Sequence, residues 1–296
     1  CLWSFEGRPS TDVEQNRGVV VPSDERRNFR GGSAGGRPSG PRTGGRPGSR
    51  PGPKASDERR APRPPEPELP DDASADELPA EIRRDLLSLD RNNADTVARQ
   101  LLMAGRLLDD DPAAALEYAR AARRRAGRIA VVRETAGVAA YHAGEWAEAL
   151  AELRAARRMA GGNTLLSVMA DCERGLGRPE RAIELVRSPE GRSLTGDEAI
   201  ELRIVEAGAR LDLGQPDQAV VVLQTRDLDP ARTGSTAARL FYAYAEALVA
   251  AGRSADALTW FLNAAAADTE GVTDAEERVA EFAEGTESAE STGESS

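Results

Sequence analysis

Apolar residues between residues 80 and about 270 recur at the spacing of amphipathic helices, not in the alternation that is typical of strands. Trp146, Leu150 and Leu153, for example, fall on one face of a helix because they are three or four residues apart. Short segments that contain small residues separate the helical ones. The pattern therefore predicts an all-α fold built from about five helical hairpins.

The predicted hairpins repeat along the chain. In four places, a glycine at a predicted turn is followed five residues later by an alanine and then by a large apolar residue. The pairs are Gly144 with Ala149, Gly177 with Ala182, Gly214 with Ala219, and Gly252 with Ala257. One unit earlier, Ala115 lies 34 residues before Ala149, and Asp110 stands where the glycine would be. Each unit is therefore predicted to be a helix, a tight turn and a second helix.

Residues around these turns predict where the helices begin and end. Glycine favours the left-handed conformation that ends a helix, and proline is tolerated at the first position of the next one. The prolines at such positions are Pro112, Pro179 and Pro216. Asp111 and Ser254 are predicted to cap second helices, and Thr195 with Glu198 is predicted to form a capping box. The recurring alanine is expected to keep the two helices of a hairpin close together.

This pattern resembles the tetratricopeptide repeat (TPR) superfamily, whose unit is roughly 34 residues long. The residues that match its consensus in order are Gly137, Gly144, Trp146, Ala149, Leu153 and Ala156. The resemblance covers residues 94–267, and the whole chain is similar to TPR proteins of high-GC bacteria that carry an Arg/Gly/Pro-rich leader. It implies a TPR-like right-handed solenoid of about five helix-turn-helix hairpins.

The composition divides the chain into three segments. Residues 1–76 form an Arg/Gly/Pro-rich leader that turns acidic near its end, residues 77–284 form the helical solenoid, and residues 285–296 form an acidic tail. The leader and the tail have too few large apolar residues to bury, so we expect both to be disordered. A short helix near 273–284 is expected to cap the end of the solenoid.

The formal net charge of −11 is unevenly distributed. Eight basic and no acidic residues lie between Arg26 and Lys54, whereas nine acidic residues and two arginines lie between Glu66 and Asp90. Lys54 is the only lysine, so arginine supplies nearly all of the positive charge. Two interpretations follow for the basic leader: contact with nucleic acid, or contact with acidic segments of the same chain.

Candidate chemistry is sparse. His142 is the only histidine, and Glu145 follows it, but both flank a predicted repeat turn without further metal-ligating residues. The segment from Gly31 to Gly35 fits a nucleophile pattern that requires a strand before it, and none is predicted there. Cys172 is expected to be a small buried residue of a first helix. We therefore expect no enzyme, no cofactor and no bound metal.

Our first functional hypothesis is a non-enzymatic scaffold that binds protein or peptide. The TPR resemblance implies that the first helices line a concave groove. Its contact positions map onto Glu134, Val138, Tyr141, His142, Thr164, Ser167, Asp171, Arg174, Glu201, Arg239, Tyr242 and Glu246. The lysine-containing clamp with which some TPR proteins hold C-terminal carboxylates is absent, because the repeats contain no lysine. The four acidic residues in the set favour a mixed or basic-tolerant peptide.

The alternative hypothesis is an RNA- or ribosome-associated adaptor. Arginines interspersed with glycines in residues 28–53 resemble tails that bind single-stranded nucleic acid. Arginines on two successive second helices would form one basic ridge if these helices stack. The predicted anion contacts are Arg30, Arg37, Arg42, Arg46, Arg50, Arg120, Arg123, Arg124, Arg157 and Arg158. The other interpretation of these arginines is a solvated linker and a solvated helix face.

The remaining expectations concern location. The sequence has no apolar run long enough to span a membrane, no secretory signal pattern and too few cysteines for a disulfide framework. We therefore expect a cytoplasmic protein that binds no membrane and no small-molecule substrate. The chain begins with Cys1 rather than Met, which favours a start at Val19, Val20 or Val21; a lipidated Cys1 is the alternative.

Overall fold

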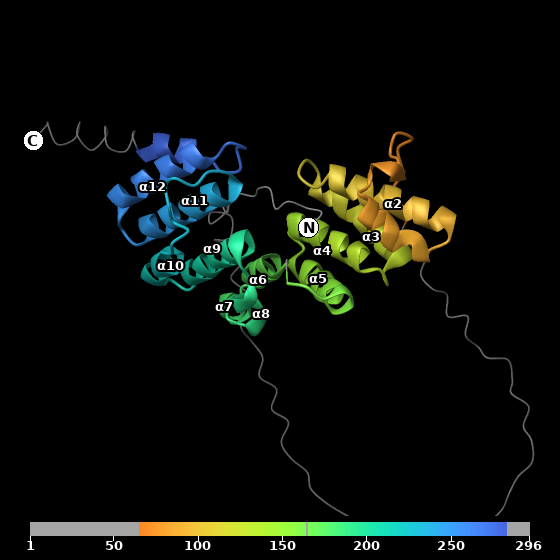
Figure 1. The fold of residues 1–296 in the computed structure, drawn as a ribbon, viewed down its shortest axis with the longest axis horizontal. Helices are drawn as coiled ribbons and strands as arrows, with labels where there is room; N and C mark the ends of the chain where they lie inside the picture. Colours follow the sequence, from red (N-terminus) through yellow and green to blue (C-terminus); the bar gives the residue numbers. More distant parts are fainter. Residues whose placement is uncertain (1–64, 164, 283–296) are drawn as a thin grey trace, which may run out of the picture. The chain divides into compact units, whose positions relative to one another are not determined.

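The computed structural model describes residues 65–163 and 165–282, which form helices and irregular segments with no strand among them. The predicted all-α class is confirmed for this part of the chain (Figure 1). The elements are η1 (Ala75–Glu77), α1 (Ala80–Asp85), η2 (Leu86–Ser88), α2 (Arg91–Arg106), α3 (Pro112–Ala126), α4 (Ala130–His142), α5 (Trp146–Ala160), α6 (Leu166–Gly175), α7 (Pro179–Val186), α8 (Pro189–Ser193), α9 (Gly196–Asp212), α10 (Pro216–Leu223), α11 (Ser235–Ala250) and α12 (Ser254–Ala267). Residues 275–282 are also helical.

Consecutive helices pair into five hairpins over these residues: α2 with α3, α4 with α5, α6 with α7, α9 with α10, and α11 with α12. Each hairpin packs against the hairpins before and after it, and α8 lies in the connection between α7 and α9. The first helices α2, α4, α6, α9 and α11 contact one another in that order. This packing between neighbours in the chain is typical of solenoids, and it aligns the first helices in a row.

The tight turns inside four hairpins share one backbone conformation. Gly144, Gly177, Gly214 and Gly252 have φ values of +75°, +69°, +66° and +75°. At the first of these turns the Glu145 N–H donates to the carbonyl of residue 140 at 2.8 Å, and the equivalent bond at each of the other three is 2.9 Å. This is the hydrogen bond of a glycine-terminated helix, and it satisfies a carbonyl that the helix leaves without a partner. The prediction of helix-ending glycines is confirmed.

The predicted helix starts are partly correct. Pro112, Pro179 and Pro216 are the first residues of α3, α7 and α10, and the Asp111 carboxylate accepts a hydrogen bond from a backbone N–H of α3 at 3.0 Å. The predicted cap at Ser254 is wrong, because the turn is so tight that Ser254 is itself the first helical residue of α12. The predicted capping box at Thr195 is also wrong. Thr195 occupies the cap position, but its side chain accepts no hydrogen bond from α9.

The recurring alanines lie where the two helices of a hairpin approach each other. Their relative exposure is 0 % in all five hairpins: Ala115, Ala149, Ala182, Ala219 and Ala257. The same close approach makes glycine necessary at position 137 of α4, where an added Cβ would lie 2.6 Å from the Leu153 side chain of α5. Small residues therefore set the spacing within a hairpin, as the sequence predicts.

The C-terminal end is closed by the predicted terminal helix. Residues 275–282 are helical, and Ala275 belongs to the core cluster that α9, α10, α11 and α12 form. Phe282 lies with its ring centroid 5.7 Å from that of Phe261 in α12. An aromatic contact thus covers the hairpin of α11 and α12 on the side away from α9 and α10.

The N-terminal boundary differs from the predicted one. Residues 66–76, which the composition assigned to the leader, contact α2 and α3 through hydrogen bonds and ion pairs. Ser74 and Glu77 form a capping box around η1. The prediction placed the boundary too late because it weighed apolar content, whereas this segment is held by polar contacts with arginines.

We expect Ala149→Leu to lower the free energy of unfolding by about 1–3 kcal/mol, because the larger side chain has no space between α4 and α5. Ala151 lies on the same helix with an exposed side chain, so Ala151→Leu should change it by less than about 0.5 kcal/mol. Urea denaturation followed by circular dichroism measures both variants. Equal effects would contradict the role assigned to Ala149.

Candidate functional site

The predicted groove residues lie on α4, α6, α9 and α11, the first helices that contact one another in succession. We call their side chains the first-helix row. Val138, His142 and Tyr242 are buried, and Thr164 lies outside the described residues. Six of the remaining members connect neighbouring helices through hydrogen bonds and ion pairs: Tyr141, Asp171, Arg174, Glu201, Arg239 and Glu246.

Three members of the row form one hydrogen-bonded chain across α4, α6 and α9. The Tyr141 hydroxyl donates to Asp171 at 2.6 Å, and the Arg174 guanidinium donates to the other oxygen of Asp171 at 2.8 Å. Arg174 also donates to both oxygens of Asp212, at 2.8 and 3.2 Å. Burial and the charge of Asp171 raise the pKa of the Tyr141 phenol, so it stays protonated and acts as a donor.

Glycine makes room for this chain. An added Cβ at Gly208 of α9 would lie 2.5 Å from the Arg174 guanidinium. The arginine therefore lies flat against the backbone of the next first helix, and any larger residue at position 208 would displace it. Sequence analysis missed Gly208 and Asp212. Both lie about one repeat after Arg174 in the sequence, and this spacing was the available signal.

The other charged members are paired in the same way. Arg239 of α11 donates to Glu201 of α9 at 2.6 Å, and both side chains are largely buried. Arg278 of the terminal helix lies 2.9 Å from Glu246 of α11 and 5.2 Å from the centroid of the Phe261 ring. Burial raises the pKa of Glu201 and of Glu246, against the opposing effect of each arginine.

Glu134 of α4 differs from these carboxylates. It is half-buried, and no arginine of the described residues forms an ion pair with it. Burial raises its pKa above the ordinary glutamate value. Ser167 of α6 is also half-buried. Glu134 is thus a partly desolvated carboxylate at a predicted contact position.

The surroundings of His142 and Cys172 indicate structural roles for both side chains. His142 is the last residue of α4, its Nδ1 lies 3.8 Å from an Asp109 oxygen, and its ring packs edge-on against Tyr141. Cys172 is fully buried in α6, and burial raises the pKa of its thiol to about 12, which makes it a poor nucleophile. Among the residues that the structure places, no three His, Cys, Asp or Glu side chains are grouped to hold a metal ion.

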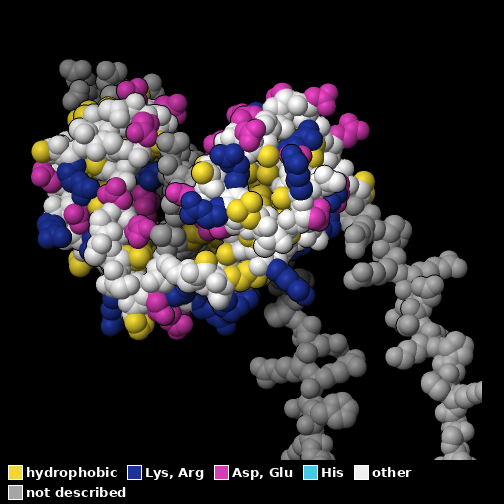
Figure 2. All heavy atoms as spheres, turned by 45° about the vertical axis from the view of Figure 1, so that its right-hand side comes forward, with side chains coloured by type: hydrophobic (Ala, Val, Ile, Leu, Met, Phe, Trp, Pro, Cys, Tyr) yellow, Lys and Arg dark blue, Asp and Glu magenta, His cyan; other side chains and the backbone are white. Residues whose placement is uncertain are grey.

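The predicted basic ridge is largely neutralised. Arg120 of α3 binds Glu148 of α5 at 2.5 Å, and this hydrogen bond lowers the pKa of Glu148. Arg123 pairs with Glu152, and Arg157 donates to the side chain of residue 163 at 3.1 Å. Acidic and basic side chains are accordingly interspersed on the face shown in Figure 2.

Two ridge residues differ from the rest. One Arg124 nitrogen is buried without a hydrogen-bond partner, and the Arg158 side chain is exposed. The predicted leader contacts, Arg30, Arg37, Arg42, Arg46 and Arg50, lie outside the described residues.

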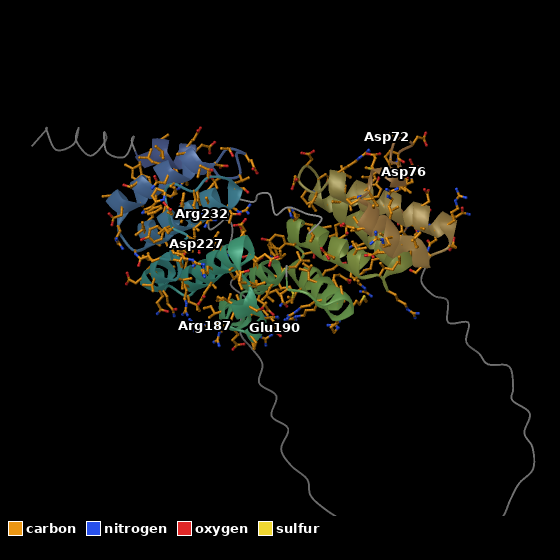
Figure 3. The ribbon with its side chains drawn as sticks, viewed as in Figure 1. Asp72, Asp76, Arg187, Glu190, Asp227 and Arg232 are labelled. Atoms are coloured by element: carbon orange, nitrogen blue, oxygen red, sulfur yellow. The ribbon has the colours of Figure 1, made fainter. Side chains whose placement is uncertain are left out.

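Instead of a ridge, polar contacts between successive hairpins recur five residues after the repeating alanine. Arg154 of α5 donates to Glu173 of α6 at 2.7 Å. Arg187, at the end of α7 and labelled in Figure 3, donates to Glu206 of α9 at 3.1 Å. One hairpin later Gln224 donates to the Tyr244 hydroxyl at 2.8 Å. These contacts were missed by the sequence analysis; the fixed offset from the alanine marks the donor positions, but the acceptors are known only from the structure.

No protein-family model and no curated protein matches the chain. In the part of the chain that the structure describes, none of the helices has the length and apolar character needed to cross a bilayer.

We expect Arg154→Ala to lower the free energy of unfolding by about 1–3 kcal/mol, because Glu173 is 2 % exposed and would lose its closest cation. Arg158→Ala on the same helix is the matched control and should change it by less than about 0.5 kcal/mol. Thermal denaturation measures both. If the second variant is as destabilised as the first, the contact with Glu173 is not what stabilises this junction.

We expect Glu134→Gln to stabilise the protein at neutral pH, by up to about 1 kcal/mol. The folded-state pKa is raised, so the folded protein binds the proton more tightly than the unfolded chain does. The contribution of Glu134 to stability is therefore fully present at acid pH and falls as pH rises through the raised pKa. The gain should vanish near pH 4, close to the unfolded pKa of about 4.3. Urea titrations at several pH values test this, with the exposed Glu184→Gln as control.

Proposed function

We propose that the chain is a non-enzymatic TPR-like scaffold, a right-handed solenoid that binds an extended protein segment along its first-helix row. Three observations support this proposal: the five hairpins pack on their neighbours, the turns and small residues repeat, and polar side chains line successive first helices. Repeated first helices offer a continuous series of contacts to one extended ligand, which is how solenoids bind their partners.

We place the binding site on the basis of one observation: the carboxylates of the first-helix row are unequally paired with arginines. Asp171, Glu201 and Glu246 each accept from an arginine of the row or of the terminal helix. Glu134, half-buried in α4, has no such partner in the described part of the chain. A desolvated carboxylate gains most from a charge-assisted hydrogen bond. In the proposed complex, Glu134 therefore forms an ion pair with a basic side chain of the bound segment.

The RNA-adaptor alternative has less support from the described residues. Arg120, Arg123 and Arg157 already bind carboxylate or amide oxygens, so fewer cations are available to phosphates. A first-helix row with one carboxylate that has no ion-pair partner among the described residues suits a basic protein segment and repels a nucleic-acid backbone. The proposal therefore takes protein as the partner.

The test is affinity capture from nuclease-treated lysate with the full-length wild type, Glu134→Gln and Glu184→Gln. We expect proteins that the wild type and Glu184→Gln capture equally to fall about tenfold or more with Glu134→Gln, the loss expected for one charge-assisted hydrogen bond. Since Glu134→Gln should be no less stable than the wild type, unfolding does not explain such a loss.

Two results would count against the proposal. Capture that nuclease abolishes would favour the adaptor hypothesis. Capture that is equal for all three proteins would mean that partners bind elsewhere than at the first-helix row.

A further inference from the structure

The segment before η1 is extended and rich in proline. Residues 65–73 read PEPELPDDA and contain no regular secondary structure apart from a turn that closes with the Ala73 N–H donating to the Pro70 carbonyl at 3.1 Å. Proline has no N–H and favours extended backbone, so few carbonyls of this segment can pair within it. We call residues 66–73 the acidic strap.

Side chains of the first hairpin donate hydrogen bonds to the carbonyls of the acidic strap. Arg99 of α2 donates to the Ala73 carbonyl at 2.8 Å and to the Pro70 carbonyl at 2.7 Å. Tyr118 of α3 donates to the Glu68 carbonyl at 2.6 Å. Contacts of this kind recognise the extended main chain rather than particular side chains, as in other modes of peptide recognition.

Three further donors recognise acidic side chains. Arg125 of α3 holds Glu66 through two nitrogens, at 2.7 and 2.9 Å, and Gln100 of α2 donates to the same oxygen at 3.2 Å. Arg106 of α2 binds Asp72 at 3.1 Å, which Figure 3 labels beside Asp76. Arg99, Gln100, Arg106, Tyr118 and Arg125 together form what we call the strap-binding site.

The acidic strap and the following residues are attached in different ways. Leu78, Ile82 and Leu86 are buried in the core cluster with residues of α2, α3 and α4. Within the strap, only Ala73 is buried; the side chain of Asp72 is 75 % exposed and that of Glu66 is 35 % exposed. Exposed ion pairs and single hydrogen bonds are individually weak. The strap can therefore leave its site while the core behind it stays folded.

We propose that the strap-binding site is a receptor for an extended, acidic, proline-containing segment of a partner protein, and that the acidic strap is a ligand in cis that this segment displaces. The complementarity is already present, since two arginines meet carboxylates and three side-chain donations meet main-chain carbonyls. The site lies on α2 and α3 and does not rest on the function proposed for the first-helix row.

Tethering explains why the site is closed in the free protein. A covalently attached ligand acts at an effective concentration in the millimolar range, so an untethered peptide competes poorly until the cis contacts are weakened. Glu66→Lys should weaken them, because it places a cation against Arg125. Two measurements on the full-length chain then test the proposal.

The first measurement is hydrogen exchange of the Ala73 amide, which donates to the Pro70 carbonyl within the acidic strap. We expect faster exchange in Glu66→Lys than in the wild type, with α2 unchanged. If Glu66→Lys does not accelerate it, the double variant Glu66→Lys, Asp72→Lys removes the second acidic contact as well. Exchange that stays as slow as in α2 in both variants would show a fixed cap and overturn the proposal.

The second measurement is fluorescence anisotropy of a labelled synthetic peptide with the sequence PEPELPDDA. We expect it to bind Glu66→Lys about tenfold or more tightly than the wild type. Arg99→Ala in the same background should abolish binding, because it removes the donor to two carbonyls. Arg91→Ala is the matched control on α2, since Arg91 is exposed, and it should leave binding unchanged.

Three outcomes would overturn the assignment. If the peptide does not bind to a variant whose strap is released, the contacts between the strap and the first hairpin serve only to stabilise the fold. Binding that survives Arg99→Ala would not be at this site. Concentration-dependent dimerisation of Glu66→Lys through its own strap would assign the site to a second copy of the chain instead of a partner protein.

Discussion

The close approach of the two helices in each hairpin is the constraint on which the rest of the structure depends. A buried alanine five residues after a glycine of positive φ brings the helices together at four turns, and Ala115 does so without the glycine. The glycine allows the chain to reverse in the fewest residues, and the alanine leaves no side chain in the way. Each hairpin is then closely packed within itself, and it stacks on the hairpins before and after it.

Small residues also limit how much apolar surface a hairpin buries, because the stabilisation from burial scales with apolar area. Polar contacts supplement it at the junctions. Arg154 with Glu173 and Arg187 with Glu206 join one hairpin to the next, with the carboxylate buried and the arginine at the surface. The arginines of the second helices therefore belong to the architecture, and their abundance is a poor indicator of nucleic-acid binding in this protein.

The pairing of charged and polar side chains also identifies two places where the chain is suited to bind another molecule. In the first-helix row, Asp171 and Glu201 form ion pairs with arginines, whereas Glu134 forms none within the described residues. On the first hairpin, Arg99 and Arg125 bind carbonyls and a carboxylate of a segment that has little apolar attachment. One site lacks a partner among the described residues, and the other holds a partner that can be exchanged.

The sequence by itself determined the local features: the all-α class, the five hairpins, the glycine turns, the prolines at helix starts and the buried alanines, because each follows from backbone preference or from periodicity within a few residues. It could not decide which charges meet, since Arg120 with Glu148 and Arg125 with Glu66 are far apart in the chain. The ridge and the leader boundary were misjudged for that reason. Only tertiary packing determines whether a charged side chain faces water, a partner helix or a segment of its own chain, because Coulomb and hydrogen-bond energies depend on distance in space.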